Sequence, residues 1–176
     1  AGGEEYALAM EIDEAQPSYT QLLIQEGLVI YTDDGLDTDL DDPLAVSAFA
    51  DLVKLMDDKI MPEYKVLSDT KATDLFMSEK AAMVYVGSWK ASVLDSASFA
   101  ANIGLIPMPT RINGNCALGG ISYAMSAYSE NKDAAWKLIS YLGGEESNRI
   151  QAEARIEIPA YIDVQDTYGP SFQSID

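Results

Sequence analysis

The stretch Phe76-Met-Ser-Glu-Lys-Ala-Ala-Met-Val-Tyr-Val-Gly-Ser-Trp89 decides how the rest of the chain is interpreted. Its first residues end a helix, and 81–86 is a short apolar run, which is typical of a strand covered on both faces. Gly87 breaks this run and Ser88 is a good N-cap, so we predict a sharp turn into another helix. Trp89 stands at the start of that helix. An indole left near solvent at such a turn indicates that it faces a ligand.

The composition is that of an ordinary globular chain. The 176 residues can build one good-sized core or at most two small domains, and 48% hydrophobic against 23% charged residues is not a disordered composition. No apolar run approaches the roughly 20 residues needed to cross a bilayer. There is also no basic segment followed by an apolar one, so we expect any export signal to lie outside this sequence.

The charge and the rare residue types narrow the possible functions. A net charge of −18 argues against nucleic acid and against anionic membranes, both of which recruit lysine and arginine. The single cysteine, Cys116, excludes an internal disulfide and a multi-cysteine metal site. The chain has no histidine, which removes the commonest general base, the commonest zinc ligand and the usual catalytic triads. We therefore expect no cofactor and no metal, and an enzyme would depend on carboxylates, lysine or tyrosine.

Strand patterns alternate with helix patterns along the chain, which predicts an α/β fold. The expected strands are 6–10, 28–31, 81–86, 102–109 and 121–127, with a short extended segment at 156–159. The expected helices are 17–25 ending at Gly27, 43–59, 69–78, 89–99, 131–142 with Gly143 at its C′ position, and 144–155. No internal repeat and no low-complexity stretch is present.

The helix from Pro43 to about Lys59 is the clearest of these. Asp42 is a suitable N-cap and Pro43 a suitable first residue, because its missing N–H would lack a helical partner there in any case. Apolar residues recur on one face, which predicts that this face packs into the core. They are Leu44, Ala48, Leu52 and Leu55, with Phe49, Val53 and Met56 beside them.

The acidic residues before this helix do not make a calcium loop. The spacing Asp37-x-Asp39-x-Asp41 begins like an EF-hand, but that loop needs glycine at its sixth position and glutamate at its twelfth. Those positions hold Asp42 and Ala48. A solvated loop that leads into the helix N-terminus explains the segment better.

Two catalytic patterns also fail. The glycine spacing of 114–119 matches a phosphate-binding loop, but Gly120-Ile121 stands where lysine and serine or threonine belong. The turn at Gly87-Ser88 is not a nucleophile elbow, because the pattern Gly-x-Ser-x-Gly is absent and no histidine could activate the serine. A pair of carboxylates of the glycosidase type stays open among the 29 acidic residues, although nothing singles out a pair.

The order of the motifs resembles one known family. Leu75-Phe76-Met-Ser-Glu-Lys80-Ala-Ala-Met83 followed by Gly87-Ser-Trp89 is similar to the "F-x-x-G-K-A-A-M … G-x-W" block of extracellular solute-binding proteins of ABC transporters, in particular the carbohydrate-binding, maltose-binding-protein-like members. Glu79 departs from this block, since the family usually has glycine there. Further pieces follow in the family's order over 41–160: Asp41-Asp42-Pro43, Ile106-Pro107-Met108-Pro109, Leu118-Gly-Gly-Ile-Ser-Tyr-Ala-Met125, Asn131-Lys-Asp-Ala-Ala-Trp136 and Ile158-Pro159-Ala160.

The resemblance implies an architecture and a role. Members of this family have two α/β lobes and bind sugar in the cleft between them, which closes by hinge bending. This chain resembles the second lobe alone: one α/β lobe over 1–176, of the type II periplasmic-binding-protein-like fold, with a central mixed sheet flanked by helices. We accordingly expect the first lobe and a C-terminal extension to be absent from it. The resemblance also implies an extracellular or periplasmic protein, tethered as a lipoprotein in its full-length form, with transporter permease subunits as partners.

The expected ligand is a mono- or oligosaccharide. A sugar needs a flat apolar surface for its C–H face and polar groups for its hydroxyls, and we predict Trp89 as the stacking surface. Gly87 and Ser88 would allow close backbone approach and offer N–H donors. The remaining candidates are Gly119 and Gly120 on a neighbouring loop, Tyr123 as a second ring, and Arg155 before the segment that lines the cleft in the family.

Other interpretations of the same residues stay open. Tyr123 on a strand fits the core as well as a ligand contact, and Gly119-Gly120 fits a simple turn. Trp136 lies in a helix and is expected to pack into the core. For the whole chain, a non-enzymatic sugar-binding module is the leading hypothesis, and a carboxylate-dependent glycoside-processing enzyme is the alternative.

Overall fold

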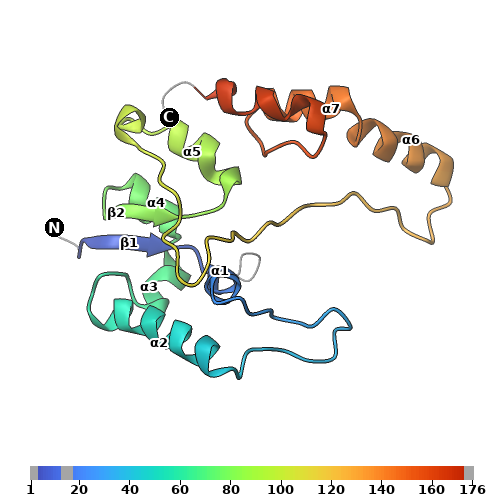
Figure 1. Cartoon of the computed structure of the whole chain (residues 1–176). Helices are drawn as coiled ribbons and strands as arrows, with labels where there is room; N and C mark the ends of the chain where they lie inside the picture. The colour runs from blue at the N-terminus through green and yellow to red at the C-terminus, as the bar shows by residue number, and fades with distance from the viewer. Residues whose placement is uncertain (1–3, 13–17, 173–176) are drawn as a thin grey trace. The chain divides into compact units, whose positions relative to one another are not determined.

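The computed structural model describes residues 4–12 and 18–172 (Figure 1). The chain divides into two compact units, the first formed by Ala1–Val86 and Ile106–Leu118 and the second by Gly87–Leu105 and Gly119–Asp176. The first unit contains β1 (Tyr6–Met10), α1 (Ser18–Gln25), α2 (Pro43–Asp57), α3 (Tyr64–Asp69), α4 (Ala72–Met77) and β2 (Ala81–Tyr85). The second contains the 3₁₀ helix η1 (Ser88–Lys90), α5 (Ala91–Asp95), η2 (Ala100–Asn102), α6 (Lys132–Leu142), α7 (Glu145–Glu153), η3 (Ile162–Thr167) and η4 (Gly169–Ser171).

The core of the first unit forms on its sheet. Strands β1 and β2 pair in parallel, with Tyr6 opposite Ala81 and Met10 opposite Tyr85, and α4 packs on both strands. Parallel strands need a long crossover connection, which α1 to α4 supply here. The buried core cluster consists of Ala9, Met10, Met61, Leu67, Ala72, Leu75 and Ala81.

A buried carboxylate connects the end of β1 to α4. The residue before α4, Lys71, makes no side-chain cap, so the first N–H groups of this helix need another acceptor. Glu11 supplies it: its Oε2 accepts from the Ala72 N–H at 2.9 Å and its Oε1 accepts from the Thr73 hydroxyl at 3.3 Å. Glu11 is only 4% exposed, so its charge is held inside the unit by these contacts.

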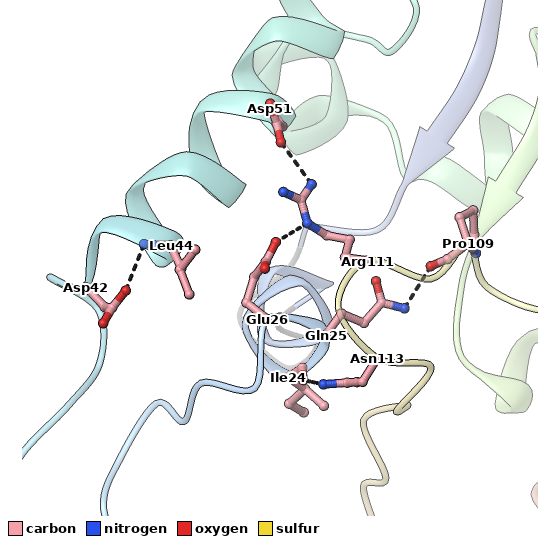
Figure 2. A network of polar contacts seen from close by, with 9 residues as sticks. All are labelled: Ile24, Gln25, Glu26, Asp42, Leu44, Asp51, Pro109, Arg111 and Asn113. Atoms are coloured by element: carbon pink, nitrogen blue, oxygen red, sulfur yellow. Dashed lines mark hydrogen bonds and ion pairs between the residues drawn. The ribbon is translucent and has the colours of Figure 1, made fainter.

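Polar side chains of α1 hold the extended segment 106–118 in place (Figure 2). The amide of Gln25 donates to the carbonyl of Pro109 at 2.9 Å, and the amide of Asn113 donates to the carbonyl of Ile24 at 3.0 Å. The Gln21 side chain donates to the carbonyl of Asn115 and accepts from the N–H of Ala117, both at 2.6 Å. Gln21 and Gln25 are almost fully buried, so they provide partners for backbone groups that a sheet would otherwise satisfy.

Arg111 joins three parts of the first unit. It lies on the extended segment and forms ion pairs with Glu26, just after α1, and with Asp51 on α2, the latter at 2.9 Å (Figure 2). The Glu26 side chain is 4% exposed and the Arg111 side chain 33% exposed. The guanidinium therefore compensates a carboxylate that would otherwise be buried without a partner.

Four helices end with the same backbone arrangement, a Schellman motif, although only one of them has glycine in it. After α1, Gly27 has φ of +77° and the two hydrogen bonds of the motif form, Gly27 N–H to Ile24 and Leu28 N–H to Leu23. The equivalent left-handed residues after α2, α4 and α7 are Lys59, Glu79 and Arg155, with φ of 59°, 58° and 61°. For a residue with a Cβ, this conformation has a steric cost.

The second unit is built on helices. Helix α7 contacts both α6 and η3. Ala152 on α7 and Val164 on η3 are fully buried in this unit. Helix α6 has no buried residue. Trp136 on α6 is 62% exposed, so the expectation that it packs into the core is wrong. The apolar face of α6 is covered only in part: Ala135, Ile139 and Leu142 are half-buried, whereas Trp136 lies exposed.

Several element predictions are confirmed. The strand 6–10, the helix ending at Gly27 and the helix starting at Pro43 all form, and the Asp42 side chain accepts from the Leu44 N–H at 2.8 Å as an N-cap does (Figure 2). Helix α2 turns the expected face to the core, except that Leu44 and Val53 are largely exposed. Pro17 of the predicted first helix lies outside the described residues.

The strands predicted at 28–31, 102–109 and 121–127 are wrong, because the structure has no strand there. A strand needs a neighbour for its backbone groups, and within 4–12 and 18–172 the sheet has two strands, β1 and β2, which run parallel. The mixed sheet that we expected is thus represented by one parallel pair. Strand β2 is also not covered on both faces, since Met83 is 47% exposed.

Three helix predictions need correction as well. The helix expected at 69–78 is the shorter α4, because Asp69 already ends α3, which was not predicted, and Thr70 between the two helices is extended. The helix expected to reach Phe99 ends with α5 at Asp95. Gly143 does follow α6, but with φ of −83° it does not use the left-handed conformation that favours glycine at C′.

Replacing Glu79 by glycine should stabilise the first unit. Glycine removes the cost of the left-handed conformation, partly offset by its larger unfolded-state entropy, so Glu79→Gly should raise the free energy of unfolding by about 0.5–1 kcal/mol in urea denaturation. Glu79→Ala, which removes the carboxylate and keeps the Cβ, is the matched control and should give no such gain. A loss of stability in Glu79→Gly would contradict this explanation.

Removing Arg111 should destabilise the first unit more than removing another paired arginine. Arg111→Gln leaves Glu26 buried without its cation, and because the guanidinium is partly exposed we expect a loss of about 1–3 kcal/mol in urea denaturation. The control Arg149→Gln breaks an exposed pair with Glu145 and should cost about 0.5 kcal/mol or less. Equal losses of unfolding free energy in the two variants would contradict the claim that the burial of Glu26 makes its ion pair with Arg111 more important for stability.

Candidate functional site

The candidate site begins with the turn that presents Trp89. Gly87 precedes the 3₁₀ helix η1, the Lys90 N–H donates to the Gly87 carbonyl at 3.0 Å, and α5 follows directly. The sequence prediction made Ser88 the N-cap of this element. That detail is wrong, since Gly87 occupies the cap position and no side chain makes a cap bond.

The ring of Trp89 folds back over Gly87. A Cβ at position 87 would lie 2.0 Å from two atoms of the ring, Cη2 and Cζ3, and 2.4 Å from Cζ2. The φ of Gly87 is −79°, which any residue can adopt, so the glycine is required for space and not for its backbone conformation. Trp89 remains 43% exposed. One part of the indole thus lies on the backbone of Gly87, while another part is accessible to solvent.

The carbonyl of Ser88 is tied to the C-terminal part of the second unit. It accepts from the Tyr168 hydroxyl at 3.0 Å and also from the backbone N–H of Ala91. Tyr168 is 9% exposed. Burial raises the pKa of its phenol above the usual value, and the negative charge of Glu157 adds to the effect. The phenol is therefore protonated at neutral pH and can donate a hydrogen bond to the Ser88 carbonyl.

Arg155 makes contacts within the second unit. Its Nη1 donates to Asp95 Oδ2 at 2.5 Å, and its guanidinium lies 5.9 Å from the centre of the Phe172 ring. The Asp95 side chain is 3% exposed, so the ion pair compensates a buried carboxylate at the end of α5. Arg155 also lines a shallow, open depression with Glu153, Asp166, Thr167, Pro170 and Ser171. Its contact with a ligand stays a prediction.

The other predicted site residues lie on an extended stretch. A Cβ added to Gly119 or Gly120 would have nothing within 4 Å, so neither glycine is needed for space. Tyr123 is 49% exposed. Among the described residues, no hydrogen bond or ring contact joins these three residues to Trp89. Of the predicted site residues, the structure thus connects the turn 87–89 with Arg155, through contacts of Tyr168 and Phe172. Gly119, Gly120 and Tyr123 are not part of this group.

Sequence reasoning missed the residues that support this turn. Tyr168, Phe172 and Asp95 come from segments in which we saw no pattern or only a generic helix. The one available signal was the pair Tyr168 and Phe172, two large aromatic residues four apart in a tail otherwise rich in polar residues. Their rings meet edge to face, with centres 5.0 Å apart.

The acidic loop before α2 uses its carboxylates locally. Asp39 accepts from the Val29 N–H at 2.9 Å, and Asp37 accepts from the Thr38 N–H at 2.8 Å. In the described part of the chain, no group of three or more His, Cys, Asp or Glu side chains is placed to hold a metal ion. Nor does any helix in that part have the length and apolar character to span a membrane.

The family follows from the sequence as a whole. A family model of the bacterial extracellular solute-binding proteins matches residues 5–174. The chain belongs to this family. The resemblance found in the Phe76–Trp89 block is thereby confirmed over nearly the whole sequence.

Individual relatives agree with this assignment. The galactooligosaccharide-binding protein of Bacillus subtilis (strain 168) is 32% identical over 89 residues, which are 49% of this chain and 21% of that protein. An ABC substrate-binding protein from Listeria monocytogenes, solved in complex with cycloalternan, matches with a TM-score of 0.67 and 20% identity over 98% of this chain and 47% of its own. A sugar transporter protein from Rhizobium etli in an open conformation matches with a TM-score of 0.55, 20% identity, and coverage of 98% and 46%.

These matches confirm the predicted fold class, the α/β fold of solute-binding proteins. The chain spans about half the length of the two solved structures, and its 89-residue match to the Bacillus protein covers 21% of that protein. The expectation that it forms one lobe over 1–176 stays a prediction.

Replacing Gly87 by alanine should move Trp89 with little effect on folding. The new methyl group occupies the place of the ring, and because the ring is the end of a side chain, the ring is the part that shifts. In a Trp136→Phe background, where Trp89 is the sole tryptophan, Gly87→Ala should shift the fluorescence emission to longer wavelength and increase quenching by acrylamide.

Gly119→Ala is the matched control, since that position is open, and it should leave the emission unchanged. Unchanged emission in Gly87→Ala as well would contradict the close seating of the indole.

Proposed function

We propose that this chain is part of the substrate-binding component of an ABC sugar importer, which captures a mono- or oligosaccharide without transforming it. The observation that carries the proposal is Trp89: an indole seated on a glycine backbone, 43% exposed, at a turn in a member of the solute-binding family. A fixed, half-exposed indole offers a flat apolar face to the C–H groups of a sugar ring. The galactooligosaccharide and cycloalternan named for two of the relatives support a sugar as the ligand class.

The other candidate residues have supporting roles in this proposal. The backbone N–H groups at Gly87 and Ser88 would bind hydroxyl groups of a sugar stacked on Trp89. Gly119, Gly120 and Tyr123 would contribute from the exposed extended stretch, with Tyr123 as a second ring. Arg155 would contact a ligand that lies in the depression it lines, and it would keep its ion pair with Asp95.

Catalysis by carboxylates is the less supported alternative. A glycosidase needs one carboxylate with a raised pKa close to a second one, both facing a substrate. Within the described part of the chain, the most buried carboxylates have structural partners instead: Glu11 binds the start of α4, Glu26 pairs with Arg111, and Asp95 pairs with Arg155. We therefore propose that the chain is not an enzyme.

The extracellular family supports a proposal for where the protein works. We propose an extracellular or periplasmic location, with a lipoprotein anchor in the full-length protein and with permease subunits and a first lobe as partners. The net charge of −18 disfavours nucleic acid.

Loss of Trp89 should abolish most of the sugar affinity. Trp89→Ala should weaken binding of a galactooligosaccharide or a glucose-based oligosaccharide by about 30-fold or more, the usual effect of truncating a central aromatic contact, as measured by isothermal titration calorimetry. Trp136→Ala, which removes the other tryptophan, should leave the affinity unchanged.

Equal effects of the two substitutions would contradict the role of Trp89. Turnover of a chromogenic glycoside by the unsubstituted chain would favour the enzymatic alternative.

A further inference from the structure

Three residues of the second unit support the turn that carries Trp89, and we call them the C-terminal brace: Arg155, Tyr168 and Phe172. They follow α7 or belong to the segment around η3 and η4. The turn itself has no side-chain cap, so nothing within η1 fixes its first residues beyond its own backbone bonds. The brace supplies that restraint from a distant part of the sequence, since Tyr168 and Ser88 are 80 residues apart.

The first contact of the brace is made by Tyr168. Its hydroxyl donates to the Ser88 carbonyl at 3.0 Å, and the residue is 9% exposed. The ring is in turn held by Phe172, which packs against it at 80° with the centres 5.0 Å apart. The hydroxyl is thus delivered by a ring that packing keeps in place.

The second contact is made by Arg155. Its ion pair with Asp95 holds the last residue of α5, while its guanidinium lies over the Phe172 ring. The turn and the helix after it are therefore tied at both ends, at Ser88 and at Asp95. Phe172 connects the two ties, since it contacts both Arg155 and Tyr168.

We propose that Tyr168 is a positioning residue for Trp89, acting through the Ser88 carbonyl. This inference rests on the proposed function, in which Trp89 stacks on a sugar. The carbonyl of Ser88 and the N–H of Trp89 belong to one planar peptide group, so a hydrogen bond to that carbonyl fixes the plane from which the Trp89 side chain departs. Without the hydroxyl, this carbonyl keeps only its bond from the Ala91 N–H, so the peptide plane is less restrained and the indole is held less firmly on Gly87.

Removal of a single oxygen atom should therefore have a specific effect. Tyr168→Phe keeps the ring and its packing on Phe172 and removes only the hydrogen bond. In the Trp136→Phe background without sugar, it should shift the Trp89 emission to longer wavelength and increase acrylamide quenching. With a bound oligosaccharide as the probe, the dissociation constant should rise about 3- to 10-fold, the usual effect of losing one hydrogen bond.

Tyr128→Phe is the matched control. It removes the same atom from a residue of the same unit that is 94% exposed, and it should change neither the emission nor the affinity. A purely structural role of Tyr168 would lower the melting temperature, followed by circular dichroism, and leave the emission of the folded protein as it was. That result would overturn the proposal.

The remaining outcomes also decide. If Tyr168→Phe does not fold, Phe172→Leu takes its place, because it keeps the Tyr168 hydroxyl and loosens the packing of the Tyr168 ring. It should shift the Trp89 emission in the same direction by a smaller amount. An unchanged emission would overturn the proposal. If the chain binds no sugar and the emission still shifts, the proposed function fails while the positioning of Trp89 by Tyr168 is supported. If sugar binds and Tyr168→Phe changes neither readout, the positioning role fails and the proposed function stands.

Discussion

The space above the Gly87 backbone is the constraint on which the candidate site depends. Because position 87 has no side chain, the Trp89 ring can lie within 2.0 Å of where a Cβ would be. This seating fixes one part of the indole and leaves 43% of the residue accessible. A freely rotating tryptophan would lose conformational entropy whenever a ligand bound, whereas a seated one has already lost it on folding. Two contacts hold the ends of the segment that carries it, from Tyr168 to the Ser88 carbonyl and from Arg155 to Asp95 at the end of α5.

Few cations are available inside a strongly acidic chain. With 11 basic against 29 acidic residues, most carboxylates have no cation to pair with and lie on the surface. The two arginines that compensate buried carboxylates each connect segments far apart in the sequence. Arg111 joins the extended segment to α1 and α2 through Glu26 and Asp51, and Arg155 joins the end of α7 to α5 through Asp95. A buried ion pair adds little net stability by itself, but it strongly penalises arrangements in which the carboxylate loses its partner. These pairs therefore specify which segments meet.

Local sequence signals predicted what depends on neighbouring residues. Asp42 and Pro43 marked the start of α2, and Gly27 marked the end of α1, because caps and left-handed residues act within one turn of a helix. The sites that depend on distant partners were predicted less well. Segments 102–109 and 121–127 have the composition of strands, but pairing needs a neighbour that no local pattern reveals. Trp89 could be selected from its position after a strand and a glycine. Tyr168 could not, since its contact with Ser88 joins residues 80 positions apart and a tyrosine in an irregular tail carries no periodic signal.

Trp89, and not the other tryptophan, is the residue that we expect to meet the sugar. The chain has two tryptophans, so a ¹H–¹⁵N correlation spectrum should show two indole N–H signals, which the single substitutions assign. On titration with an oligosaccharide, we predict that the Trp89 signal moves progressively to saturation while the Trp136 signal stays in place. A sugar that bound with the Trp89 signal unmoved, or with the Trp136 signal moving alone, would contradict this role.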